Sequence, residues 1–168
     1  MPNHSEPEWR AIEDLPSDLP ATLFACIATT GSLTIRLREL GVLRVELIKE
    51  YVENTNWCRD VVLWINNIPA VIGHSVILAD ALEDPALHSL KKLGTRPLGE
   101  VIFAELKGIR EVLEFSCVGT QDILFNLAKP YLQTYEKKLY ARRSTVKIQQ
   151  HKITVHEVFL PVFYEDIL

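Results

Sequence analysis

The chain has 168 residues, of which 48% are hydrophobic and 24% are charged, and its formal net charge is −4. This composition predicts one globular domain spanning residues 1–168, large enough to bury about two-thirds of its unfolded surface. A net negative charge gives no general attraction to nucleic acid or to an anionic membrane. Any anion must therefore be bound by a local basic cluster.

The sequence shows no targeting or membrane-spanning segment. The first ten residues are charged and lack the apolar stretch of a signal peptide, and no apolar run is long enough to span a bilayer. The cysteines Cys26, Cys58 and Cys117 lie far apart and outside any Cys-x-x-Cys spacing. We therefore expect them to be reduced core residues of a cytoplasmic protein, with no metal or disulfide role.

In chain order, the first predicted elements are a surface lead-in, two helices and three strands. Residues 1–20 contain four prolines and form the lead-in. Helices are predicted over residues 21–28 and 32–40; Thr29-Thr30-Gly31 separates them, Ser32 or Thr34 caps the second, and Gly41 ends it. Alternating patterns predict strands over residues 42–52, 57–65 and 70–78, and Asn66-Asn67 supplies the turn of a hairpin.

The second half of the chain continues the mixture of helices and strands. A loop or short helix follows residue 78, and Gly94 and Gly99 then bracket Pro97 in a stiff turn. A helix is predicted over residues 100–106, a strand over 110–116, and a helix over 122–140 that Pro130 kinks or divides. Two strands within residues 142–161 close the chain. Strands in hairpins with helices between them predict an α+β fold with a single antiparallel sheet.

Charged residues stand in phase with apolar residues on the last two predicted strands. Glu157 shares a strand face with Ile153, Val155 and Phe159, where a carboxylate is costly unless it is paired, protonated or hydrogen-bonded. Arg142 offers the opposite charge, in phase with apolar residues of the preceding strand. The pattern indicates either a pocket or a buried ion pair, and we favour the pocket.

Arg59 repeats this pattern, because it shares a strand face with Trp57, Val61 and Leu63. The alternatives are a structural salt bridge, or an arginine that reaches water from the sheet edge. Arginine is suited to binding a carboxylate through two parallel hydrogen bonds. His74 also lies in phase with apolar residues, and alone such a histidine is more often a core residue than a ligand.

The sequence contains none of the common motifs for metal binding, nucleotide binding or hydrolysis by a serine nucleophile. The histidines show no His-Glu-x-x-His or other metal-ligand spacing, and the seven glycines form neither a P-loop nor a Gly-x-Gly-x-x-Gly motif. Ser144 lacks a nucleophile-elbow motif. The sequence therefore favours no metal, nucleotide or hydrolase site.

Several segments together resemble the chorismate pyruvate-lyase family, the enzymes that make 4-hydroxybenzoate. In chain order they are WCRDVVL at residues 57–63, GHSVI at 73–77, LGTRPLG at 93–99, RRS at 142–144 and HEVFLP at 156–161. Ser32-Leu33-Thr34 with Arg36 also resembles an early segment of the family. The resemblance covers most of the chain from about Gly31 to Pro161.

The resemblance implies a six-stranded antiparallel sheet and a product pocket closed by helical flaps. It implies that Arg59 binds the ring carboxylate, that the backbone N–H groups of Leu33 and Leu98 assist, and that Glu157 reaches the 4-hydroxyl end. Arg59 and Glu157 would be the catalytic pair of a lyase that releases pyruvate with no cofactor and no metal. Its partner would be the small molecule chorismate, and its product would enter quinone or methanopterin-type cofactor biosynthesis.

Chorismate carries two carboxylates, so Arg59 needs help from another cation, for which Arg142, Arg143 and Lys49 are candidates. His74 is expected to bind substrate because it stands where the family has an arginine. Since histidine loses its charge near pH 6.5, activity is expected to fall as the pH rises through about 6.5. The chain also departs from the family at Leu78, usually a proline, and in a longer segment between residues 103 and 142.

Two other functions fit the same residues. The first alternative to the lyase is a non-catalytic small-molecule-binding domain, as in the effector domains of some bacterial regulators with this fold. The second is a protein in which Arg59 and Glu157 only pair with each other inside the sheet. Addition of chorismate distinguishes them: a lyase releases pyruvate, a binding domain only binds, and a structural pair does neither.

Overall fold

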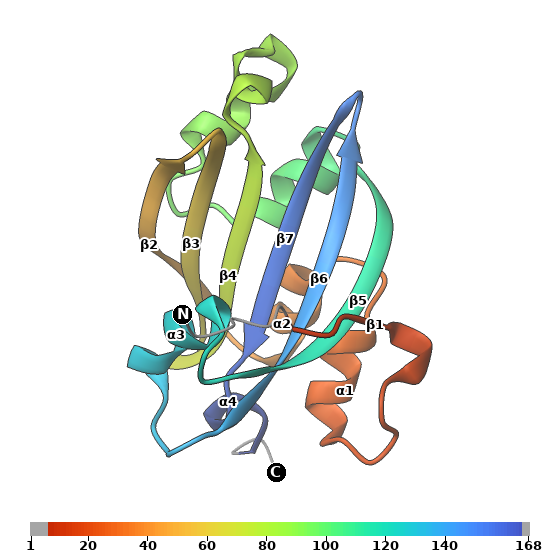
Figure 1. Ribbon diagram of the computed structural model, residues 1–168, viewed down its shortest axis with the longest axis vertical. Coiled ribbons are helices and arrows are strands. Elements are labelled where there is room, and N and C mark those ends of the chain that lie inside the picture. Colours follow the sequence, from red (N-terminus) through yellow and green to blue (C-terminus); the bar gives the residue numbers. More distant parts are fainter. Residues whose placement is uncertain (1–6, 166–168) are drawn as a thin grey trace.

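The computed structural model describes residues 7–165 and contains one seven-stranded sheet with helices packed on both faces (Figure 1). All strand pairs are antiparallel, in the order β1-β5-β6-β7-β4-β3-β2. The strands are β1 (Arg10–Ala11), β2 (Leu43–Glu53), β3 (Asn56–Ile65), β4 (Ile68–Leu78), β5 (Ile109–Gly119), β6 (Lys138–Ile148) and β7 (His151–Phe159). The predicted α+β fold with a single antiparallel sheet is confirmed.

The helices are short, and most of them lie on one face of the sheet. They are η1 (Ile12–Asp14), α1 (Ala21–Ala28), α2 (Leu33–Leu40), η2 (Ala79–Glu83), η3 (Pro85–Lys92), η4 (Glu100–Glu105), α3 (Ile123–Ala128), η5 (Lys129–Tyr131) and α4 (Pro161–Glu165). No helix within residues 7–165 is both long and apolar enough to cross a membrane.

The hairpin turns use residues that tolerate a left-handed backbone. Asn66 and Asn67, with φ of 49° and 63°, join β3 to β4, and Asn54, with φ of 55°, lies in the turn between β2 and β3. A two-residue turn of this hand matches the twist of the strands it connects. Ser32 caps α2 by accepting a hydrogen bond from the N–H of Ile35 at 3.3 Å, as predicted.

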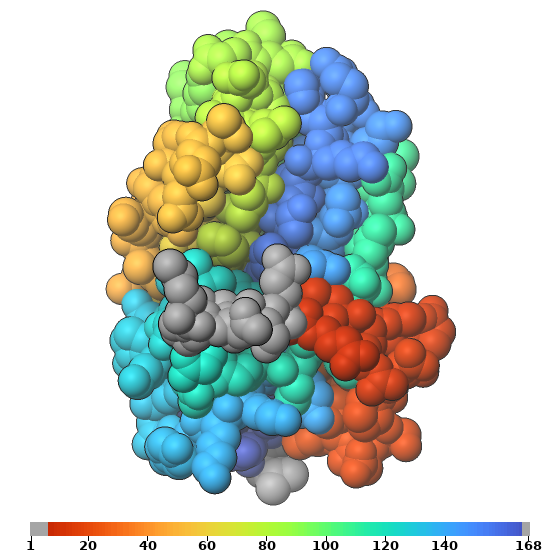
Figure 2. Space-filling model, in the orientation of Figure 1, coloured from red at the N-terminus to blue at the C-terminus, as the bar shows by residue number. Residues whose placement is uncertain are grey.

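The two faces of the sheet bury different sets of side chains. On one face, α1, α2, η3 and η4 pack against apolar residues that alternate along β3, β4, β6 and β7. On the other face, α3 and Trp9 cover Val62, Ile72 and Val158. Figure 2 views this second face, where the segment around α3 covers the lower part of the sheet. Arg59, Arg142 and Glu157, the charged residues that stand in phase with apolar neighbours, lie on the first face.

The predicted helix over residues 122–140 is wrong in its second half. Helix α3 ends at Ala128, one turn follows around Pro130, and β6 begins at Lys138. Pro130 has no N–H with which to continue the helix. Leu139 pairs with Val118 of β5 and is 1% exposed, so this part of the chain is buried better as a strand.

The lead-in also differs from expectation. Arg10 and Ala11 pair with Phe115 and Glu114 of β5 and add a seventh strand to the six implied by the family resemblance. All three cysteines are free, but only Cys26 and Cys58 are core residues. Cys117 points to solvent because it alternates with the buried Ser116 and Val118 along β5.

Candidate active site

A cavity lies between the first face of the sheet and the helices that cover it. Side chains from β2 to β7 form its floor, and the first turn of α2 and residues 97–103 form its cover. The cavity volume that the centre of a water molecule can occupy is about 70 Å³. One bound water needs roughly 10–15 Å³ on the same measure, so the cavity has room for a larger ligand. Four charged residues line it: Arg59, Arg110, Arg142 and Glu157.

Arg59 reaches the cavity from β3 and holds part of its cover. Its side chain is 1% exposed, and Nη2 donates to the carbonyl oxygens of Gly94 at 2.9 Å and Arg96 at 3.2 Å. Its Nε lies 3.5 Å from a carboxylate oxygen of Glu50, within ion-pair range but without a hydrogen bond. Burial lowers the pKa of Arg59 and Glu50 raises it, yet a guanidinium keeps its charge at any physiological pH.

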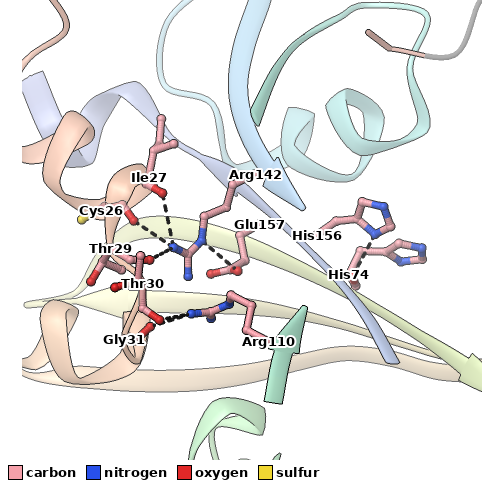
Figure 3. A network of polar contacts seen from close by, with 10 residues as sticks. All are labelled: Cys26, Ile27, Thr29, Thr30, Gly31, His74, Arg110, Arg142, His156 and Glu157. Carbon is pink, nitrogen blue, oxygen red and sulfur yellow. Dashed lines mark hydrogen bonds and ion pairs between the residues drawn. The ribbon is translucent and has the colours of Figure 1, made fainter. Parts of the chain in front are cut away.

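Arg142 and Glu157 form a buried ion pair at the other end of the cavity. They are direct partners across β6 and β7, and Arg142 Nε donates to Glu157 Oε1 at 3.1 Å. Arg142 Nη1 also donates to the carbonyl oxygens of Cys26, Ile27 and Thr29 (Figure 3). Because the last carbonyls of a helix have no partner inside the helix, Arg142 satisfies the end of α1.

Arg110, near the start of β5, is a cavity residue that the sequence interpretation missed. Its Nη1 donates to the carbonyl oxygens of Thr30 and Gly31, and its guanidinium lies 4.9 Å from the centre of the Phe103 ring. Burial and the nearby charge of Arg142 lower the pKa of Arg110, and Glu157 raises it. In Figure 3, Arg110 lies beside the Arg142–Glu157 pair.

The cavity contains polar atoms that have no partner. In residues 7–165, the buried side-chain atoms without a hydrogen bond are Arg59 Nε, Arg110 Nε, Ser144 Oγ and Ser89 Oγ, and the first three belong to residues that line the cavity. Buried polar groups in proteins are nearly always paired. Two unpaired guanidinium N–H groups and a hydroxyl in one cavity indicate that it is built for a polar, anionic ligand.

Comparison with known proteins assigns the family. The sequence profile described as Chorismate lyase matches residues 4–167. The chain belongs to the chorismate lyase family. A probable chorismate pyruvate-lyase of Thiobacillus denitrificans is 32% identical over 158 residues, which cover 84% of each chain. A chorismate pyruvate-lyase of Yersinia enterocolitica is 31% identical over 170 residues, or 92% of this chain and 89% of that one.

Solved structures resemble this chorismate lyase family member in fold. The effector domain of PhnF from Mycobacterium smegmatis has a TM-score of 0.51 at 9% identity, covering 79% of this chain and 90% of that chain. A GntR-family transcriptional regulator from Bacillus cereus has a TM-score of 0.50 at 10% identity, covering 71% and 92%. At these identities the similarity concerns the fold alone.

In this member of the chorismate lyase family, five of the six anticipated site residues line one cavity: Leu33, Arg59, Leu98, Arg142 and Glu157. Leu33 is the first residue of α2, and Leu98 begins the helical segment that leads into η4. The N–H groups in the first turn of a helix have no partner inside the helix. Both leucines therefore bring backbone donors to the cover of the cavity.

His74 is the sixth residue, and the expectation that it shares the cavity of Arg59 is wrong. A β-bulge near Leu63 shifts the β3–β4 register by one residue, so that Arg59 pairs with Ser75 and His74 pairs with Asp60. His74 consequently lies on the opposite face, where its Nδ1 is 2.6 Å from the buried carboxylate of Asp60. The argument that activity falls above pH 6.5 because His74 binds substrate in this cavity therefore fails.

The other cations considered for a second carboxylate also lie outside the cavity. Arg143 alternates with Arg142 along β6, so it points to the opposite face and pairs with Glu114 at 2.8 Å. Lys49 is exposed on β2, with its ammonium 4.7 Å from the ring centre of Tyr51. Of the alternatives named from the sequence, only Arg142 lines the cavity with Arg59.

Proposed function

We propose that this protein is a chorismate pyruvate-lyase, which converts chorismate to 4-hydroxybenzoate and pyruvate with no cofactor. The observation that carries the proposal is the lining of the cavity, which has three guanidiniums and one carboxylate, with Glu50 outside the lining at 3.5 Å from Arg59. Chorismate is a dianion, so its two carboxylates complement a lining in which guanidiniums predominate. The names of the similar bacterial proteins support the same activity.

The reaction needs the protein only to bind the substrate and to stabilise the negative charge that develops on the departing oxygen. The bond between ring carbon C3 and the enolpyruvyl oxygen breaks, and the ring loses the hydrogen on C4. The methylene carbon of the departing group gains a hydrogen, which completes the methyl group of pyruvate. Substrate and products contain the same atoms, and no external oxidant or reductant is needed. Because the ring becomes aromatic, the protein needs only to hold a reactive conformer and to stabilise the departing oxygen.

Five of the cavity residues have a role in this scheme. Arg59, whose Nε makes no hydrogen bond and lies 3.5 Å from a Glu50 carboxylate oxygen, binds the ring carboxylate, and the N–H groups of Leu33 and Leu98 add hydrogen bonds from the cover. Glu157 lies at the opposite end and accepts a hydrogen bond from the C4 hydroxyl. Its pairing with Arg142 fixes the direction of the carboxylate during the reaction.

The test is to add chorismate to the purified protein, follow pyruvate with a coupled dehydrogenase, and quantify 4-hydroxybenzoate by chromatography. Arg59→Ala should lower kcat/KM by about 30- to 1000-fold, because a desolvated charge contact contributes about 2–4 kcal/mol to transition-state binding. The matched control is Arg44→Ala, whose side chain is 52% exposed on β2, pairs with Glu46 and lies outside the cavity. This control should retain full activity.

The possible results separate the alternatives. Binding of 4-hydroxybenzoate without any release of pyruvate would identify a binding domain. Neither binding nor turnover would refute an aromatic-acid site altogether. An Arg59→Ala protein that folds and keeps its activity would remove Arg59 from the site.

A further inference from the structure

Arg110 is the least compensated of the buried or half-buried arginines. Within residues 7–165, every arginine except Arg110 and the exposed Arg10 has a carboxylate oxygen within 4.0 Å. The hydrogen-bond partners of Arg110 are two neutral carbonyl oxygens, and its Nε has no partner. A partly buried cation without a counter-charge is costly. A ligand anion would supply the missing charge.

Arg142 is a poorer candidate for that ligand contact, although it lines the same cavity. It is fully buried, Glu157 neutralises its charge, and its Nε and Nη1 are occupied by Glu157 and by three backbone carbonyls. Its Nη2 makes no hydrogen bond to the described residues, but an anion there would compete with Glu157 for a charge that is already balanced. Arg142 therefore orients Glu157, and Arg110 is left to bind an anion.

The position of Arg110 agrees with the shape of the substrate. Arg59 binds the turn at Gly94–Arg96, whereas Arg110 lies beside the Arg142–Glu157 pair and donates to the same turn as Arg142 (Figure 3). In chorismate the ring carboxylate is on C1 and the hydroxyl is on C4, at opposite ends of the ring. The enolpyruvyl group is on C3, next to the hydroxyl. With Arg59 on the ring carboxylate and Glu157 on the hydroxyl, the second carboxylate falls at the end where Arg110 lies.

We propose that Arg110 binds the enolpyruvyl carboxylate and thereby makes the cavity select a dicarboxylate over a monocarboxylate of the same ring. This inference rests on the proposed function. Arg110 is a specificity-determining residue, because the departing group carries the carboxylate that it binds. Once pyruvate has left, 4-hydroxybenzoate retains only the carboxylate held by Arg59, and Arg110 returns to its uncompensated state.

The test compares two ligands in the same variants. The dissociation constant of 4-hydroxybenzoate is measured by titration calorimetry and that of chorismate by stopped-flow fluorescence before turnover, together with kcat/KM for chorismate. Arg110→Gln should weaken chorismate binding and kcat/KM by about 10- to 150-fold, the value of one charge-assisted contact. Its affinity for 4-hydroxybenzoate should change by less than about threefold on the same scale. Arg59→Gln should weaken both ligands, and Arg44→Gln should weaken neither.

Arg110→Lys guards against a purely structural effect. A lysine keeps the charge and the ability to donate to the turn at Thr30 and Gly31, so this variant should fold even if the glutamine variant does not. It should lose part of the chorismate affinity and none of the affinity for 4-hydroxybenzoate. Equal weakening of both ligands in Arg110→Lys and Arg110→Gln would show that Arg110 only supports the cover of the cavity. Unchanged affinities for both would also overturn the proposal.

Failure of this inference is distinct from failure of the proposed function. A wild-type protein that binds chorismate but releases no pyruvate refutes the lyase, while the two-ligand comparison still tests Arg110. A wild-type protein that binds neither compound refutes both. A wild-type lyase whose arginine variants show no ligand selectivity refutes Arg110 alone.

Discussion

Replacing Arg142 with methionine should destabilise the protein strongly, because it breaks an ion pair inside the core. Methionine fills a similar volume but donates no hydrogen bond. The change leaves Glu157, which is 7% exposed, without its partner and also removes the donor shared by the carbonyls of Cys26, Ile27 and Thr29. Breaking one side of a buried pair leaves an uncompensated charge, which costs about 3–5 kcal/mol.

This cost predicts a readily measured change in melting temperature. In a domain of this size, each kcal/mol lowers Tm by about 2–4 °C, so Arg142→Met should lower Tm by roughly 6–20 °C. Arg143→Met is the matched control, since this neighbour on β6 pairs with Glu114 on the partly exposed opposite face, and it should lose about 1 kcal/mol or less. Both variants are measured by urea unfolding and by calorimetry at neutral pH.

The double variant Arg142→Met/Glu157→Leu separates loss of charge pairing from loss of packing. Removing the carboxylate as well should recover about 2 kcal/mol or more relative to Arg142→Met, because a matched apolar pair often replaces a buried ion pair without loss. Additive losses in the two single variants and the double variant would refute the reasoning. So would an Arg142→Met protein as stable as the wild type.

Three further predictions concern stability elsewhere in the fold. Burial and the neighbouring charge of His74 lower the pKa of His156 to about 4, so the unfolded chain takes up a proton near pH 6.5 that the native protein resists. The wild type should therefore lose roughly 2–3 kcal/mol of stability to this group between about pH 6.5 and 4, and urea unfolding of His156→Gln should show a smaller loss. Gly108→Ala should cost about 1–3 kcal/mol in urea unfolding, since a Cβ there would lie 2.7 Å from the Ile102 carbonyl oxygen, and a neutral result would contradict the tight approach. Asp122→Ala should lower stability by about 1 kcal/mol by removing the cap of α3, whereas Asp122→Asn should retain most of it.

The residues predictable from sequence were those on regularly alternating strands. The period of two put Arg59, Arg142 and Glu157 among apolar neighbours, and the structure places all three in one cavity. Both residues that were wrongly assigned lie on strands with a β-bulge, and His74 had been included because it stands where the family has an arginine. A two-residue turn at Asn66-Asn67 without a bulge would have put His74 opposite Arg59, but the extra residue in β4 moves Ser75 there.

Arg110 was missed for the same reason. The register of β5 against β6 shifts between Arg110 and Val112, so the alternation of the strand does not extend to Arg110. The sequence also gave no indication that residues 138–141 extend β6 rather than a helix. Their four-residue apolar spacing is helical, and only pairing with β5 makes the strand the better-buried alternative.

The arginines that line the cavity also hold its cover in place through hydrogen bonds to backbone carbonyls. Arg59 ties down the turn at Gly94 and Arg96, while Arg110 and Arg142 tie down the turn that joins α1 to α2. Any movement of the cover away from the sheet would break these hydrogen bonds, so a substitution of one of these arginines is expected to change both ligand binding and the stability of the cover. A variant that binds a different acid because one of these arginines is replaced is therefore expected to have a less firmly held cover as well.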